Sequence, residues 1–551
     1  MREIGSVDGT SQDLLATTLP TTDAALGGAV PPSPGEEAQA GLLRRRLTGS
    51  AIVVIVGLGI GLGTLAIGQQ PLTLPWIGIG FASLLALLLL LWNFPLGVVL
   101  FLATCWIAVG TPPIAQGGSG GGAQRLLLSH IGLIALIGMG ILRSPFVGGA
   151  ERIPRTPMNL PIALFLTICV WSTVNGLLLP DPHVLEYGPK VFWQVNVLEL
   201  MTRFLALGGL LLIGAVLRGR YLPWAAIALA VPGVMTFSGL VRGIPSSFYL
   251  AFPQVIAMSL LAAFALTGSW AGARWRWLRV PAGALAVAIF VRYFFQGTEW
   301  VSGWSAALVA LAVITYCIDR RLLVAGAAIL AIAVLLNYSY FFKTVYTDNF
   351  YAGRTAGDIN RTGQTGRFTN DRSRMLLAAV RYADTFPLGV GLGNYRAYNQ
   401  YYGRRDVWNT TTFTSAHGTY AQTLSETGWL GLGALLLLLG TCVRFLWRCF
   451  RALPASWGRT YLLGALGATI GIFVAAFLGD YLFPTYHNGG LGSFGACVYL
   501  WFTIGLATAV AREYELDWDR LIARSRPAPR AIAPVYGHGP YAPNAAEAET
   551  G

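Results

Sequence analysis

The sequence predicts an all-α polytopic membrane protein with about 14 (12–14) transmembrane helices and one large external loop that contains short helices. Two observations support this prediction. Hydrophobic residues make up 54% of the 551-residue chain and charged residues only 11%, whereas a soluble domain carries about a quarter charged residues. Apolar runs of about 18 to 25 residues, long enough to cross a hydrocarbon layer of roughly 30 Å, also recur along almost the whole length.

These runs divide the chain into five parts. Residues 1–43 contain several acids and prolines but no apolar run, which predicts a disordered cytoplasmic tail. We expect a membrane domain of about 11 transmembrane helices at 44–342, a large periplasmic or extracellular loop at 343–428, three closing transmembrane helices at 429–511, and a second cytoplasmic tail at 512–551.

The individual apolar runs follow one another with short polar breaks. They lie at about 51–69, 74–92, 95–111, 126–142, 159–180, 197–217, 221–240, 249–270, 278–295, 300–318, 322–342, 429–447, 460–483 and 489–511.

Basic residues set the expected orientation of these runs. Lys and Arg accumulate in cytoplasmic loops close to helix ends, and here they form short clusters between runs, such as Arg44–Arg46, Arg320–Arg321 and Arg512. One alternation of the runs across the membrane places these basic clusters on the cytoplasmic side. It puts both termini in the cytoplasm and the segment 343–428 outside. The net charge of +13 therefore indicates topology and not a nucleic-acid surface.

The segment 343–428 is the only large polar insertion, and a connection of that length is usually functional. It carries nine arginines, against the usual charge bias of an external loop, at positions 354, 361, 367, 372, 374, 381, 396, 404 and 405. Guanidinium groups hold phosphate oxygens in bidentate fashion and keep their charge, so these residues suit a diphosphate ligand. The alternative for any one of them is that it solvates the loop or contacts anionic headgroups.

Two helices are predicted within this loop. Residues 372–386 have helical apolar spacing, and one face of that helix combines Met375, Leu376, Ala379 and Tyr382. Pro387 and the glycines at 389, 391 and 393 end it, and residues 416–426 are again expected to be helical. The tyrosines between them either stack on sugar rings or pack the loop onto the membrane domain, and packing is slightly favoured; they are Tyr395, Tyr398, Tyr401 and Tyr402.

His417 lies at the start of the second of these helices. With an ordinary pKa near 6.5, a histidine there is suited to remove a proton from a sugar hydroxyl. A structural hydrogen bond at the helix terminus is the alternative. His487, on a short external loop, is placed where it can approach the same face, whereas His130 and His183 are expected to be structural.

Charges near the outer ends of the apolar runs default to a functional or paired role, because an unpaired charge there is costly. Glu199 and Arg203 stand four residues apart, so they either neutralise each other across one helical turn or contact a substrate. Arg292 lacks an acid at helical spacing and is the better candidate for a substrate contact; Asp480 is the fourth such charge.

No metal site and no cofactor is predicted. The six cysteines lie in or beside apolar segments without a C-x-x-C pair, which favours a packing role. The sequence also lacks H-E-x-x-H, G-x-S-x-G and Walker-type motifs, which excludes zinc proteases, common hydrolases and nucleotide-driven pumps.

Residues 370–435 resemble the O-antigen ligase and O-antigen polymerase family of bacterial envelope proteins. The resemblance rests on Arg374 in SRMLLAAVRYADTFPLGVGLGNY, where an arginine leads an amphipathic helix into a proline-glycine turn. It rests also on His417, which is followed at eleven and fourteen residues by Gly428 and Gly431. The order of many spans, one late external loop and a few closing spans agrees as well.

The resemblance implies transfer of a glycan from a polyprenyl-diphosphate carrier to an acceptor hydroxyl at the outer face of the bacterial inner membrane, by direct inverting attack without a metal. It implies His417 as the catalytic base and a diphosphate site formed by Arg372, Arg374, Arg292, Arg203 and Arg242, with Glu426, Gly428, Tyr395 and His487 in support. The partners would be the lipid-linked glycan donor, a glycan or lipid-core acceptor and membrane lipids, and no nucleic acid.

Two alternatives stay open. The enzyme is either a ligase or a polymerase, which differ only in the acceptor; attachment of the glycan to a protein uses the same chemistry and is less favoured. A transporter or flippase of the same lipid-linked glycan is the competing class, but transporters commonly show paired repeats with charges near the bilayer midplane. We find no such repeat, and the candidate charges cluster toward one face, which favours an enzyme.

Overall fold

The computed structural model describes the second of two compact units into which the chain divides, Met1–Phe81 and Ala82–Gly551. The described residues are 93–106, 115–117, 124–126, 128–143, 153–187, 192–238, 251–268, 273–296, 301–336, 338, 368–404, 416, 418–485 and 494–516. The predicted apolar runs at 51–69 and 74–92 and the amino-terminal tail lie outside these residues.

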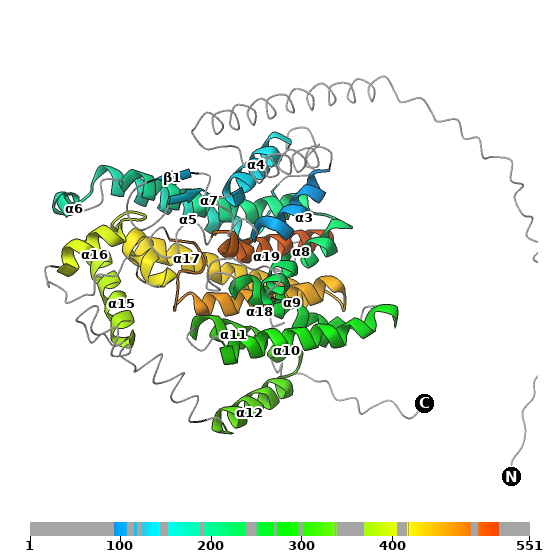
Figure 1. Cartoon of the computed structure of the whole chain (residues 1–551). Coiled ribbons are helices and arrows are strands. Elements are labelled where there is room, and N and C mark those ends of the chain that lie inside the picture. Colours follow the sequence, from blue (N-terminus) through cyan, green and yellow to red (C-terminus); the bar gives the residue numbers. More distant parts are fainter. Residues whose placement is uncertain are drawn as a thin grey trace, which may run out of the picture. The chain divides into compact units, whose positions relative to one another are not determined.

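The regular elements of the described part are helices, apart from one pair of three-residue strands (Figure 1). The helices before the polar segment are α3 (Phe94–Thr104), α4 (Leu128–Arg143), α5 (Asn159–Leu178), α6 (Pro182–Tyr187), α7 (Phe192–Val216), α8 (Tyr221–Ser238), α9 (Ala251–Thr267), η3 (Ala273–Leu278), α10 (Arg279–Gln296), α11 (Val301–Ile318) and α12 (Arg320–Leu336). The strands β1 (Ala115–Gly117) and β2 (Gln124–Leu126) pair antiparallel, with Ala115 opposite Leu126. The later helices are α15 (Phe368–Thr385), α16 (Tyr395–Arg404), α17 (Thr419–Ala452), α18 (Trp457–Ala475) and α19 (Phe494–Glu513).

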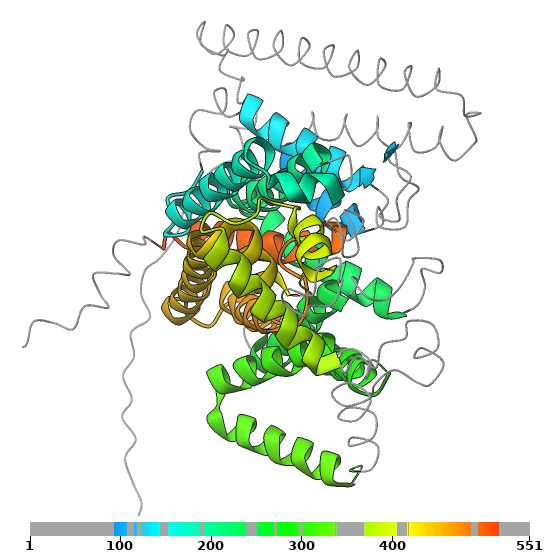
Figure 2. The ribbon, with the colours of Figure 1, turned by 90° about the vertical axis from the view of Figure 1, so that its left-hand side faces the viewer.

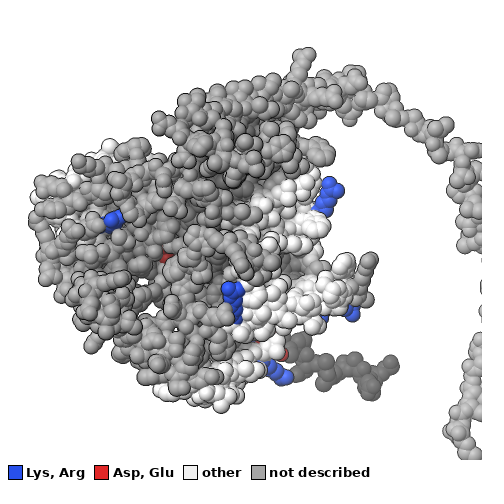
Figure 3. Space-filling model, in the orientation of Figure 1, with Lys and Arg blue, Asp and Glu red and all other residues white. Residues whose placement is uncertain are grey.

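Five described helices are long and apolar enough to cross a membrane, namely Asn159–Leu178, Val195–Val216, Thr419–Ala452, Trp457–Ala475 and Phe494–Glu513. Shorter apolar helices lie at Phe94–Thr104, Ser129–Arg143, Tyr221–Phe237, Phe252–Thr267 and Gly303–Ile318. The chain is thus a multi-pass membrane protein, while the number of about 14 spans stays a prediction. The described surface visible in Figure 3 is mostly uncharged, with scattered Lys and Arg side chains and little visible Asp or Glu.

Helix α19 lies at the centre of the described bundle (Figures 1 and 2). Every residue from Phe494 to Ala511 is buried, and the helix packs against α7, α8, α9 and α18. A helix that is apolar all round and buried on every side is the expected centre of a large bundle.

Helix α18 packs closely on α9 and α11 through a row of glycines. A methyl group at Gly471 would lie 2.3 Å from the Ala306 carbonyl oxygen of α11, and one at Gly464 would lie 2.9 Å from the Leu260 Cα of α9. Small residues allow such backbone contact between helices in a membrane, where dispersion contacts and not hydrophobic exclusion hold helices together. Larger side chains at these positions would separate the helices.

Two local expectations were wrong. The predicted run 460–483 ends as a helix at Ala475, and the chain from 476 to 485 is irregular, so Asp480 lies beyond the helix. In α15, Met375 and Tyr382 are buried as expected, but Leu376 is 53% exposed. The predicted apolar face of α15 is therefore only partly a packing face.

Candidate active site

The turn between α15 and α16 is bound to the first part of α17 through backbone hydrogen bonds. The Val390 N–H donates to the Ser425 carbonyl and the Gly391 N–H to the Glu426 carbonyl, both at 3.0 Å. The Ser172 hydroxyl of α5 donates to the same Glu426 carbonyl at 2.6 Å. Three segments that are far apart in the sequence therefore meet at Glu426.

Gly428 and Gly391 make this contact possible. Gly428 interrupts α17 with φ 68° and ψ −172°, a region essentially restricted to glycine. A Cβ atom there would lie 2.1 Å from the Pro387 carbonyl oxygen. Gly391 has φ +95° and lies against α5, where a Cβ atom would be 2.5 Å from the Gly176 Cα.

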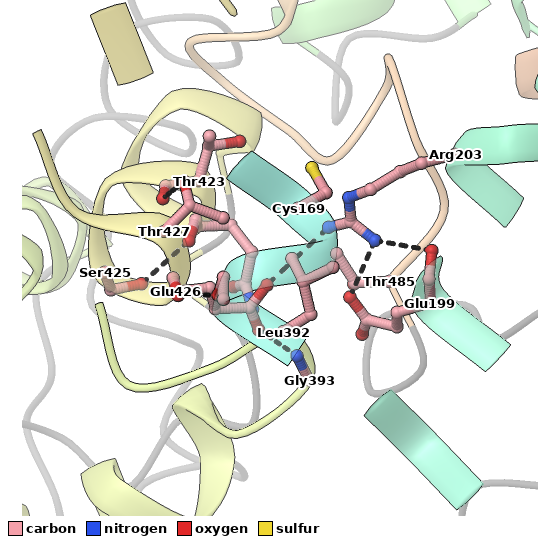
Figure 4. Close-up of polar contacts among 12 residues, drawn as sticks. Cys169, Glu199, Arg203, Leu392, Gly393, Thr423, Ser425, Glu426, Thr427 and Thr485 are labelled. Atoms are coloured by element: carbon pink, nitrogen blue, oxygen red, sulfur yellow. Dashed lines mark hydrogen bonds and ion pairs between the residues drawn. The ribbon is translucent and has the colours of Figure 1, made fainter. Parts of the chain in front are cut away.

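The Glu426 side chain lies in a buried cluster with Arg203 and Glu199 of α7 (Figure 4). Arg203 Nη1 lies 3.1 Å from Glu199 Oε2, and Arg203 Nη2 lies 3.6 Å from Glu426 Oε2. The Gly393 N–H donates to Glu426 Oε1 at 2.9 Å. One guanidinium thus faces two carboxylates, and it ties α7 to the turn and to α17.

The pairing of Glu199 with Arg203 was one of the two readings left open by their spacing. Both side chains are fully or almost fully buried, and the guanidinium also lies over the Phe483 ring, with its Cζ atom 5.6 Å from the centroid. These contacts favour a structural ion pair, since a buried charge needs such compensation. The role of Arg203 in binding diphosphate stays a prediction.

Gln422 connects this cluster to the residue before His417. The Gln422 side-chain amide donates to Glu426 Oε1 at 2.5 Å, and its oxygen accepts the Ala416 N–H at 2.9 Å. On the other side of His417, the Thr419 N–H donates to the carbonyls of Ala476 and Gly479 at 3.0 and 3.1 Å. His417 itself lies outside the described residues, but the chain on both sides of it is anchored.

Two asparagines complete the hydrogen bonding of the turn. The Asn394 amide donates to the Val390 carbonyl at 2.9 Å and to the Gly176 carbonyl of α5 at 3.3 Å. The Asn196 amide of α7 donates to the Leu392 carbonyl and to Asn394 Oδ1. The sequence reasoning missed Asn196, Asn394 and Gln422. A signal for Asn196 was present, because 196, 199 and 203 fall on one helical face and all three residues are polar.

The tyrosines pack the polar segment together, as slightly favoured from the sequence. Tyr395, Tyr398 and Tyr401 are buried and form one apolar cluster with α15 residues such as Tyr382. The Tyr382 and Tyr395 rings meet edge to face with centroids 5.8 Å apart. Tyr395 therefore lies in the packed interior, where burial raises the pKa of its hydroxyl.

The same cluster contacts the connection between α5 and α7. The Tyr402 hydroxyl donates to Asp181 Oδ2 at 2.5 Å, and the Tyr398 hydroxyl accepts the Asp181 N–H at 3.0 Å. His183 stacks on the Tyr401 ring, with centroids 6.1 Å apart, which agrees with its expected structural role. Burial raises the pKa of the Tyr398 and Tyr402 hydroxyls, so both are neutral at ordinary pH.

The other predicted site residues are placed as follows. The Arg292 guanidinium is exposed; it donates to the Phe237 carbonyl and lies over the Phe237 ring, at the end of α8. Arg372 and Arg374 lie in the first turns of α15, and their side chains are outside the described part. Arg242, His417 and His487 lie wholly outside the described residues. Among the described residues no group of His, Cys, Asp and Glu is arranged to hold a metal ion.

These features define a class: an α-helical multi-pass membrane protein in which a late polar segment is docked on a buried charged cluster. Comparison with known families agrees with this class and points to a narrower group of proteins. Residues 298–436 match the family model described as O-antigen ligase, which confirms the resemblance to the O-antigen ligase and polymerase family. The match covers about a quarter of the chain, from α11 through α15 and α16 into α17. No curated protein matches the chain.

Proposed function

We propose that the protein transfers a glycan from a polyprenyl-diphosphate carrier to an acceptor hydroxyl at the outer face of the bacterial inner membrane. The observation that carries this proposal is the O-antigen ligase match at 298–436. It contains both the helix start with Arg372 and Arg374 and the segment with His417.

The chemistry follows from these residue types. His417 accepts the proton of the acceptor hydroxyl as its oxygen attacks the anomeric carbon of the donor glycan. The bond from that carbon to the diphosphate oxygen breaks, and polyprenyl diphosphate leaves with the bonding electrons. Arg374, with Arg372, binds the negative charge that develops on the leaving group. Because attack is direct, the anomeric configuration inverts.

The described contacts support this arrangement of roles. The Ala416 N–H donates to the Gln422 side chain, and the Thr419 N–H donates to the Ala476 and Gly479 carbonyls. Hydrogen bonds therefore fix the backbone just before and just after His417. Such support matters, because catalytic groups act efficiently only when neighbouring groups fix their position. The turn after α15 is fixed to the first part of α17 through Glu426, which couples the helix that carries Arg372 and Arg374 to the helix that begins two residues after His417.

The test is transfer activity in proteoliposomes supplied with polyprenyl-diphosphate glycan and a panel of acceptors, with and without a metal chelator. We expect product from the wild type, and a loss of at least about 100-fold in His417→Ala, the usual range for a general base. Arg374→Lys should also lower the rate, because a point charge lacks the fork geometry of arginine. His183→Ala, a histidine that packs on Tyr401, is the matched control and should keep most activity.

Each outcome has a distinct meaning. Equal rates for wild type and His417→Ala would contradict the assignment of the base, and unaltered activity of Arg374→Lys would remove that residue from the diphosphate site. The acceptor consumed distinguishes a ligase, which uses a lipid core, from a polymerase, which uses another carrier-linked unit. Movement of lipid-linked glycan across the bilayer without any transfer would favour the transporter class instead.

A further inference from the structure

Helix α15 carries two adjacent leucines that are exposed. Leu377 is 50% exposed and its neighbour Leu376 is similarly exposed, although the opposite face of α15 is buried against α17 and the tyrosine cluster. In a water-facing loop, adjacent exposed leucines would be unfavourable, since burial of each in an apolar medium releases hydration water.

The membrane-facing surface of α17 has a clear stripe. Between Trp429 and Gly440, the exposed positions are Trp429, Leu430, Gly433, Leu436, Leu437 and Gly440. They recur every three to four residues, so they lie on one face of a helix. Because this helix is long and apolar enough to span a membrane, the stripe faces lipid.

A direct contact joins the two apolar surfaces. The Trp429 indole N–H donates to Asp384 Oδ1 of α15 at 3.1 Å, and this contact is exposed. Leu377 and Asp384 stand seven residues apart, two turns along the same face of α15. Leu388, also exposed, lies in the turn where Pro387 contacts Gly428. The exposed face of α15 is therefore continuous with the lipid-facing stripe of α17.

From this continuity we propose that α15 is an interfacial helix whose exposed leucines, Leu376 and Leu377, insert into the acyl chains of the bilayer leaflet next to Trp429. Tryptophan is enriched at the boundary between acyl chains and headgroups, and its bond to Asp384 places α15 at that depth. An amphipathic helix with one apolar face lies in the plane of this boundary. The occupant of the face is lipid, and this inference does not depend on the proposed reaction.

The test uses spin labels in proteoliposomes. In a Cys317→Ser background, in which the five remaining cysteines are all buried, single cysteines replace Leu377 and, as a second site, Leu388. Gly433→Cys is the matched lipid-facing control, because a Cβ atom at Gly433 meets no atom within 4 Å. Arg218→Cys, in the exposed connection between α7 and α8, is the aqueous control. Collision rates with oxygen, which concentrates in lipid, and with a water-soluble nickel chelate are compared at each site.

We expect the oxygen-to-nickel collision ratio at residues 377 and 388 to match that at 433 and to exceed that at 218 several-fold. A ratio at both sites equal to that at 218 would overturn the proposal, because α15 would then face water. Spin–spin broadening that disappears on dilution with unlabelled protein would also overturn it, because the face would then be covered by a second copy of the chain. Neither result bears on the proposed transfer reaction, which is tested separately by the activity assay.

Discussion

At the scale of single residues, Arg203 balances two buried carboxylates that belong to different parts of the chain. Glu199 lies on its own helix, whereas Glu426 lies on α17. In Arg203→Ala, both carboxylates would keep their burial but lose the cation between them. Breaking a buried ion pair from one side costs about 3–5 kcal/mol, so we expect a clearly lower free energy of unfolding.

Thermal unfolding of the purified protein in detergent measures this effect. Arg203→Met combined with Glu199→Gln and Glu426→Gln is the matched control, because it removes the cation together with both carboxylates that face it, and its loss should be smaller. If Arg203→Ala unfolds at the wild-type temperature but fails to bind the donor, the ion pair is dispensable and Arg203 belongs to the diphosphate site.

At the scale of elements, the interruption of α17 at Gly428 separates a short helix in the polar segment from a membrane span. Gly428→Ala forces a Cβ into a backbone region that costs about 1–3 kcal/mol for a non-glycine residue, and that atom would also meet the Pro387 carbonyl oxygen at 2.1 Å. We expect loss of stability beyond the backbone cost alone, together with reduced transfer.

Gly433→Ala provides the comparison for this prediction. It is a helical glycine five residues further along with open space around it, so alanine there should stabilise the helix by roughly 0.5–1 kcal/mol. Unfolding temperatures and transfer rates of the two variants separate a local conformational requirement from a general effect of alanine. Equal behaviour of both would show that the interruption at Gly428 is not required.

The positions of the elements were largely predictable, because the length and composition of an apolar run determine where a helix forms. Each predicted run from 95–111 onward overlaps a described helix. Periodicity also separated Met375 and Tyr382 from the polar face of α15, but it grouped Leu376 with them. A helical period identifies an apolar side chain without saying whether protein or lipid will cover it.

The candidate site was less predictable, because its contacts join distant segments. The four-residue spacing of Glu199 and Arg203 is visible in the sequence, whereas the partner Glu426 lies more than 200 positions away. The contact of Gln422 with the Ala416 N–H is equally invisible in the sequence, since it depends on where Ala416 lies relative to α17. Only the polar face formed by 196, 199 and 203 pointed to a buried polar contact.

At the scale of the whole described unit, the polar segment is attached to the α5–α7 connection as well as to α17. The main link is the bond from the Tyr402 hydroxyl to Asp181 Oδ2 at 2.5 Å. A hydrogen bond to a charged group contributes about 1.5–3 kcal/mol, against about 0.5–1.5 kcal/mol for a neutral one. The two ends of this contact lie 221 residues apart, so it holds α16 against α6 independently of the cluster at Glu426.

A double-mutant cycle of Asp181→Asn and Tyr402→Phe, followed by hydrogen exchange of the α16 amides, tests this attachment. Each single change should speed exchange, and the coupling between them should be about 1 kcal/mol, the difference between a charged and a neutral bond.

The pKa of Tyr402 is raised, first by burial and then by Asp181. The stability that this hydroxyl contributes is therefore complete below the ordinary tyrosine pKa of about 10 and is lost as pH rises above it. Wild-type α16 should therefore exchange faster above pH 10 than the intrinsic rate explains, and Tyr402→Phe should remove the part of this pH dependence that Tyr402 causes. Additive effects of the two substitutions, or an identical pH profile in Tyr402→Phe, would show that the segment is held by its other contacts alone.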